Sequence, residues 1–201
     1  MTHTEHVHIL FGIGLALTGA LWLGGQTTAG HRLRYVWPLI LVAVGVFLVI
    51  PTETQERTYV PVDAWDTFLS VFPNSLNVWL TTVQKVHVIQ HKVSGLCAIV
   101  AGGIEESRAC GWLTASRWSW ALPLLTIAAG LAIGIHGGTH QHLPRVVERA
   151  HHWIMGGAFV LGGIAQAIAI GHRPEHPGLQ RVLPALVLLA GFDLALFYRL
   201  H

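Results

Sequence analysis

The sequence is organised as long apolar stretches separated by shorter polar connections. A helix that crosses a bilayer needs about 20 mostly apolar residues, and six stretches fit that requirement. They are Val7–Gly25, Tyr35–Ile50, Val83–Ile104, Trp118–Ile135, His152–Gly171 and Val182–Leu200. The pattern predicts an all-α fold, a polytopic membrane bundle of six transmembrane helices that forms a single domain over residues 1–201.

The one long connection, residues 51–82, lies outside this pattern. Its large apolar residues, among them Trp65, Phe68 and Phe72, alternate with polar residues. This arrangement is typical of a helix that lies at the membrane interface. A coiled extramembrane loop is the other interpretation of the segment.

Composition agrees with a membrane protein. Only 11% of the 201 residues are charged and 52% are hydrophobic, whereas soluble domains contain about 25% charged residues. The net charge of +2 and the absence of a long basic run exclude a nucleic-acid partner. Two cysteines are too few for a disulfide scaffold. The natural partner of such a chain is the lipid bilayer.

The apolar stretches repeat in pairs. The first helix of each pair carries the pattern H-x3-G-x6-G and the second carries P-x6-G. The first pattern occupies His8, Gly12 and Gly19, then His91, Gly95 and Gly102, then His152, Gly156 and Gly163; the second occupies Pro38 and Gly45, then Pro123 and Gly130, then Pro184 and Gly191. We interpret this as three copies of one helical hairpin, at about 5–50, 83–136 and 148–200.

Each H-x3-G-x6-G pattern places its histidine and glycines on one face of a helix, because a helix has about 3.6 residues per turn. Glycine stripes allow helices to approach closely inside a membrane. The same stripes could instead leave room for a flat cofactor. The prolines lie near helix starts, where a missing N–H costs least.

Histidines are concentrated on one side of the predicted bundle. An even number of spans brings both termini to the same side, and that side receives eleven of the fourteen histidines. The other side holds compact arginine pairs, such as Arg32 with Arg34 and Arg108 with Arg117. Lysine and arginine divide six to six between the two sides, so their number alone does not decide the orientation. The compact grouping of arginines on the other side favours the cytoplasm there, and we therefore expect the histidines to face the periplasm.

These histidines are candidate metal ligands. Around a pseudo-threefold axis, His8, His91 and His152 would lie at similar depth, and His87 lies one turn from His91. The candidate ligands are His8, His87, His91, His136, His151 and His152, with His6, His140 and His142 as possible additions. Imidazole without thiolate suits copper(II), zinc and haem iron alike.

Asp193 is the one carboxylate well inside a predicted span. A charged group there is costly and tends to be functional. Asp193 could hold an imidazole N–H behind a metal ligand, carry a proton, or form a structural pair. Gln90 could also support a ligand or relay a proton, or join two helices by a hydrogen bond.

Three segments resemble a known family. H-K-V-S-G at 91–95, H-G-G-T-H-Q-H at 136–142 and H-H-W-I-M-G at 151–156 are similar to the hairpins of CopD-like bacterial inner-membrane copper-resistance proteins. The resemblance covers mainly residues 87–170, and longer family members have more than six spans. It implies copper handling at the periplasmic face of the inner membrane and exchange with a periplasmic metal carrier.

The same hairpins are also similar to membrane b-type cytochromes, which carry electrons on haem held by histidines from two helices. That resemblance implies two axial ligands chosen from His8, His87, His91, His136 and His152, with space for the porphyrin beside Gly12, Gly95 and Gly156. The partner would then be an electron carrier. A metal-dependent membrane oxidase is a third hypothesis, so whether the protein is an enzyme stays open, as does its oligomeric state.

Overall fold

The computed structural model describes residues 3–49, 86–134, 145–171 and 177–200. All regular secondary structure in these ranges is helical. The six α-helices are α1 (His3–Gly25), α2 (Trp37–Val49), α5 (Val86–Ala109), α6 (Ala121–Gly134), α7 (Arg145–Gly171) and α8 (Val182–Leu200). The connection 51–82, with its predicted interfacial helix, lies outside the described residues, as do 135–144 and therefore His136, His140 and His142.

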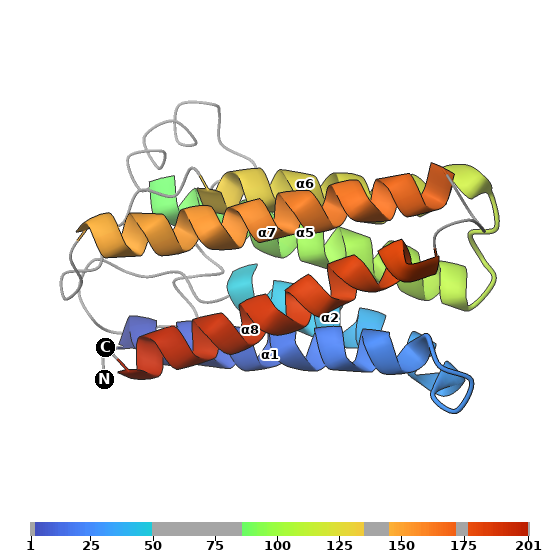
Figure 1. Cartoon of the computed structure of the whole chain (residues 1–201), viewed down its shortest axis with the longest axis horizontal. Coiled ribbons are helices and arrows are strands. Elements are labelled where there is room, and N and C mark those ends of the chain that lie inside the picture. The colour runs from blue at the N-terminus through green and yellow to red at the C-terminus, as the bar shows by residue number, and fades with distance from the viewer. Residues whose placement is uncertain (1–2, 50–85, 135–144, 172–176, 201) are drawn as a thin grey trace, which may run out of the picture.

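The α-helices form a closed ring in the order α1, α2, α5, α6, α7, α8, in which each helix packs against the two beside it. Both chain ends lie at the same end of this bundle (Figure 1). We call it the terminal end; it also holds the starts of α5 and α7 and the end of α6. The opposite end carries the short 3-10 helices η1 (His31–Tyr35), η3 (Ser116–Trp120) and η4 (Pro177–Arg181).

The second helix of each predicted hairpin begins directly after, or one residue after, one of these 3-10 helices. Pro38, Pro123 and Pro184 each occupy the second or third position of their α-helix. A proline there breaks no helical hydrogen bond, because the first N–H groups of a helix have no partner inside it. All three prolines are fully buried, so each also contributes to packing.

The glycine stripes pack against the backbone of a neighbouring helix. If the first glycine of each stripe carried a methyl group, that carbon would almost touch a carbonyl oxygen. The separation would be 2.7 Å from Gly12 to Gly191, 2.8 Å from Gly95 to Gly45 and 2.6 Å from Gly156 to Gly130. Real Cβ atoms essentially never approach this closely, so glycine is required at these positions.

The second glycine of each stripe makes an equivalent contact with the proline turn of the facing helix. A methyl group would lie 2.7 Å from the Pro184 oxygen at Gly19, 2.6 Å from the Pro38 oxygen at Gly102 and 2.9 Å from the Pro123 oxygen at Gly163. The stripes therefore join α1 to α8, α5 to α2 and α7 to α6. Each stripe meets a helix of a different predicted hairpin, not its own hairpin partner.

Four segments of the described chain are long and apolar enough to cross a membrane: His8–Gly25, His31–Val49, Arg149–Gly171 and Gly178–Phe197. The sequence predicts six. In α5, polar residues interrupt the apolar run, and α6 has 14 residues, or about 21 Å of helix. A bilayer core is about 30 Å thick. The outer surface of the bundle carries exposed Leu10, Ile154, Leu161 and Leu189, as a lipid-facing surface does.

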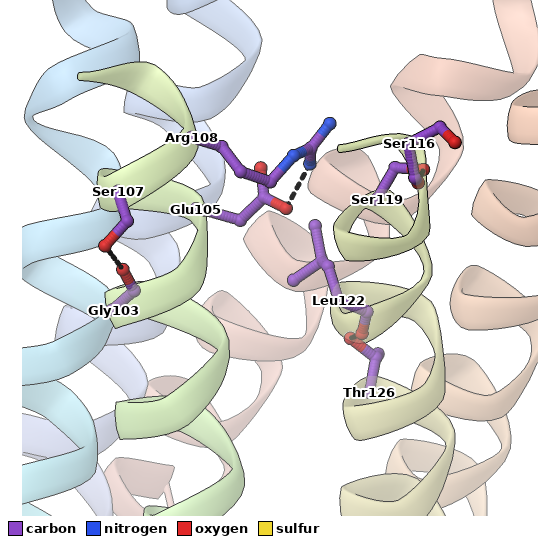
Figure 2. A network of polar contacts seen from close by, with 8 residues as sticks. All are labelled: Gly103, Glu105, Ser107, Arg108, Ser116, Ser119, Leu122 and Thr126. Carbon is purple, nitrogen blue, oxygen red and sulfur yellow. Dashed lines mark hydrogen bonds and ion pairs between the residues drawn. The ribbon is translucent and has the colours of Figure 1, made fainter. Parts of the chain in front are cut away.

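The opposite end is stabilised mainly by local polar contacts (Figure 2). Arg108 pairs with Glu105 one turn earlier on α5. The Ser107 hydroxyl donates to the Gly103 carbonyl at 2.8 Å, also within α5. One contact bridges segments: Gln26 after α1 donates to the Gln180 carbonyl in η4 at 3.0 Å. Every contact drawn in Figure 2 lies within one helix or turn.

Candidate histidine site

Three of the predicted ligand residues have described side chains, and all three are buried. His8 on α1 and His151 and His152 on α7 are each 6% exposed. All three lie near the starts of their helices, at the terminal end of the bundle (Figure 1). A buried imidazole must have polar partners, because burial of a polar group without hydrogen bonds is costly.

The clearest partner is the carboxylate of Asp193. Its Oδ2 atom lies 2.7 Å from Nε2 of His151, and the hydrogen bond joins α7 to α8. The Asp193 side chain is 50% exposed, whereas that of His151 is 6% exposed. The carboxylate therefore reaches the buried ring from the bundle surface and fixes which ring nitrogen carries the proton.

Phe197 holds the same imidazole from its flat side. The two rings are stacked, with centroids 4.0 Å apart and planes 8° from parallel. Phe197 and Asp193 are four residues apart on α8 and so share one face of that helix. The His151 ring is thus restrained by a hydrogen bond at its edge and by an aromatic ring on its face.

His152 lies beside His151 but points in a different direction. The ring centroids are 5.9 Å apart and the planes are nearly perpendicular, at 82°. Consecutive helical residues diverge by about 100°. His152 shares the stripe of Gly156, which packs on α6, whereas His151 meets α8.

His8 occupies the corresponding position on α1. It lies one turn before Gly12, and that glycine packs against Gly191 and Ala195 of α8. Buried Met155, Ala190 and Leu194 of α7 and α8 form a small apolar cluster close in sequence to His152 and Asp193.

Other predicted ligands lie partly or wholly outside the described structure. His6 belongs to α1, and His87, Gln90 and His91 belong to α5, but their side chains are not described. Among the side chains that are described, no three His, Cys, Asp or Glu residues are grouped closely enough to hold one metal ion. The predicted convergence of His8, His91 and His152 therefore stays a prediction.

The glycines expected to make room for a porphyrin are covered by protein. The space beside Gly12, Gly95 and Gly156 is occupied by the carbonyl groups of α8, α2 and α6 respectively. A flat cofactor at the terminal end would have to lie away from these three contacts. Close helix packing is the role that the glycines have in this structure.

Sequence reasoning did not single out Phe197. The signal was its spacing of four residues from Asp193, which places both on one helical face. Sequence reasoning also could not show that Asp193 and His151, which are 42 residues apart in the chain, are neighbours in the fold.

Comparisons of the chain with protein-family models, with curated proteins and with solved structures give no match.

Proposed function

We propose that the protein is an integral membrane protein that binds copper through the histidines of its terminal end. The observation that carries this proposal is the buried His151, which a carboxylate orients, with buried His8 and His152 at the same end of the bundle. These three imidazoles are not grouped closely enough to hold one ion by themselves, so the proposed site needs further histidines. The composition of the chain and its four membrane-length helices support the membrane location.

The His151–Asp193 pair has the arrangement that metal-binding histidines commonly use. A ligating histidine usually donates one ring N–H to a carboxylate or carbonyl and presents the other nitrogen to the metal. Because Asp193 engages Nε2 of His151, the metal would bind at Nδ1. Asp193 would then orient this ligand and raise its basicity.

The remaining ligands would come from His8, His152 and the histidines of α5 and the 135–144 segment, in particular His87, His91 and His136. The donor set is imidazole without thiolate, which copper(II) binds more strongly than other divalent first-row metals do. Zinc is the competitor that the same donor set allows. The resemblance to CopD-like proteins points in the same direction.

We propose that the fold is a threefold repeat of one hairpin with six membrane spans. The three glycine interfaces support this, because each pairs equivalent positions of the motifs at nearly equal separations, between 2.6 and 2.8 Å. A cyclic arrangement of that kind would bring the starts of the three repeated helices, and with them His8, His91 and His152, to equivalent heights. It leaves the histidine end at one membrane surface, where a soluble metal carrier can reach it.

The orientation follows from the basic residues of the opposite end. Arg32 and Arg34 lie in η1, Arg108 lies in the last turn of α5, and Arg117 lies in η3. Basic connections favour the cytoplasm. The terminal end would thus face the periplasm of a bacterial inner membrane, and copper would be handled there.

Haem b with two histidine ligands is the second candidate. His8 and His152 favour it because they are buried at the same end on different helices, as axial ligands from two helices are. The protein would then transfer electrons.

Elemental analysis and a visible spectrum of untagged protein distinguish the two candidates. We expect about one copper per chain and no Soret band in the wild type. His152→Ala and His151→Ala should each lose most of the copper, whereas His31→Ala, an exposed histidine at the opposite end, should retain it. A Soret band would select the haem candidate, and neither copper nor haem in folded wild-type protein would reject both.

A further inference from the structure

A cavity lies inside the ring of helices, distinct from the histidine site. The space inside it that the centre of a water-sized molecule can reach is about 70 Å³, and all the empty space, including the open mouth, is about 620 Å³. All six α-helices contribute to its wall, for example through Leu15, Val44, Ala98, Thr126, Phe159 and Val187.

The wall of the cavity is apolar. Of the described residues that line it, none carries a charge at neutral pH, and the polar exceptions are Thr18, Ser94, Cys97 and Thr126. An apolar wall of this kind favours apolar molecules over polar ones. A ligand with an ionised head group would find no counter-charge on this wall.

Ser94 has a hydroxyl group that the described structure does not use. Its side chain is buried, at 8% exposure, and its Oγ atom has no hydrogen-bond partner there. The two threonines on the same wall differ. Thr18 donates to the Gly14 carbonyl at 2.9 Å and Thr126 to the Leu122 carbonyl at 2.8 Å. A buried polar atom without a hydrogen-bond partner is costly. A ligand that accepts a hydrogen bond from the Ser94 hydroxyl would remove this cost.

We propose that the cavity binds a neutral lipophilic molecule of the quinone class, and that Ser94 donates a hydrogen bond to its carbonyl oxygen. Cys97, three residues after Ser94 and so on the same face of α5, adds a weak thiol donor to this wall. Two donors on one face favour an acceptor oxygen on the ligand. The aromatic rings of Phe11, Trp22 and Phe159 suit a flat, apolar ring.

The surrounding bilayer would supply such a molecule. This binding site contains none of the candidate metal ligands, so the proposal stands independently of copper binding. The two can fail separately, because quinone binding is measured on protein from which metal has been removed as well as on protein that retains it.

The test is a titration of decylubiquinone into protein reconstituted in lipid nanodiscs, followed by tryptophan fluorescence, since Trp22 lines the cavity. We expect saturable quenching. Ser94→Ala should raise the Kd about five- to tenfold, the effect of one lost hydrogen bond. Ala98→Phe should abolish binding by filling the cavity. Ser107→Ala, which removes a hydroxyl of the same helix that lies outside the cavity and donates to the Gly103 carbonyl, should leave the Kd within about twofold.

Three outcomes would overturn the proposal. Quenching that never saturates would mean that the probe only partitions into lipid. Equal Kd values for the wild type and Ser94→Ala would show that Ser94 does not donate a hydrogen bond to the ligand. Displacement of decylubiquinone by stearate as efficient as by another quinone would show that a neutral carbonyl is not what the cavity selects. If Ala98→Phe does not fold, the Ser94→Ala and stearate measurements still decide.

Discussion

Asp193 of α8 and His151 of α7 share a hydrogen bond of 2.7 Å at the terminal end of the bundle. The acid is half exposed and the imidazole is buried, so the bond extends from the surface of the bundle to its interior. It links the last helix of the chain to a candidate metal ligand, and it explains why a carboxylate can be accommodated within an apolar helix.

We predict that Asp193→Asn weakens copper binding about 10- to 100-fold, the effect usual for loss of a carboxylate behind a ligating histidine. Asparagine can retain the geometry of the hydrogen bond but not its charge. Competition with a copper chelator of known affinity would measure the change. Unchanged affinity in Asp193→Asn would show that the carboxylate serves the packing of α7 and α8 alone.

Phe197→Ala should destabilise the packing of α7 against α8. The variant loses the ring stacked on His151 at 4.0 Å, and such aromatic pairs contribute about 0.5–1.5 kcal/mol beyond burial. A double-mutant cycle with His151→Ala, read from thermal unfolding in detergent, isolates that contribution. Strictly additive effects of the two substitutions would contradict the stacking interaction.

Neighbouring glycines provide a matched test of the helix interfaces. At Gly156 an added methyl group would lie 2.6 Å from the Gly130 oxygen, whereas at Gly157 it would meet nothing within 4 Å. Gly156→Ala should therefore cost about 1–3 kcal/mol through overpacking. Gly157→Ala should be neutral or stabilise the helix by up to about 1 kcal/mol.

The pair Gly102 and Gly103 repeats this test on α5. A methyl group at Gly102 would lie 2.6 Å from the Pro38 oxygen, and at Gly103 it would meet nothing within 4 Å. Unfolding temperatures of the four alanine variants would show whether the two interfaces behave alike. If Gly102→Ala and Gly103→Ala unfold at the same temperature, the close approach of α2 and α5 is wrong.

Cys110 is exposed directly after the end of α5. Labelling of its thiol can test the orientation of the protein in the membrane and the effect of the nearby Glu106 carboxylate. Desolvation, a hydrogen bond to Glu106 and the charge of that carboxylate raise the pKa of the Cys110 thiol. Because the thiolate is the reactive form, maleimide labelling near neutral pH should be slow and should accelerate as pH rises. Glu106→Gln lowers the pKa and should speed labelling at a fixed pH.

In a Cys97→Ser background, Cys110 is the only thiol in the chain. A membrane-impermeant maleimide should then label inverted membrane vesicles and spare intact cells, because we place the opposite end in the cytoplasm. Labelling of intact cells would reverse the proposed orientation. A rate unaffected by Glu106→Gln would contradict the contact with that carboxylate.

Local sequence patterns predicted much of the fold. The helix positions follow from apolar length, the starts of α2, α6 and α8 from proline, and the close contacts from glycine spacing. Sequence alone could not show which helix each stripe faces. Gly12 meets Gly191 of α8, a choice set by closure of the ring and not by any residue near Gly12.

Less of the candidate site could be predicted from the sequence, because its contacts also depend on which helices face each other. His8, His151 and His152 could be chosen because they recur at the starts of apolar helices. The partnership of His151 with Asp193 and Phe197 depends on how α7 crosses α8. The central cavity depends on all six α-helices at once, so the isolated hydroxyl of Ser94 has no local signature.

The copper X-ray absorption spectrum of the loaded, desalted protein examines the donor atoms themselves. Our account predicts imidazole nitrogens at about 2.0 Å, the usual distance for metal–histidine bonds, with that pattern lost in a variant that combines His8→Ala, His151→Ala and His152→Ala. A spectrum dominated by sulfur at about 2.3 Å, or copper that washes off the folded wild-type protein, would contradict a histidine site at the terminal end.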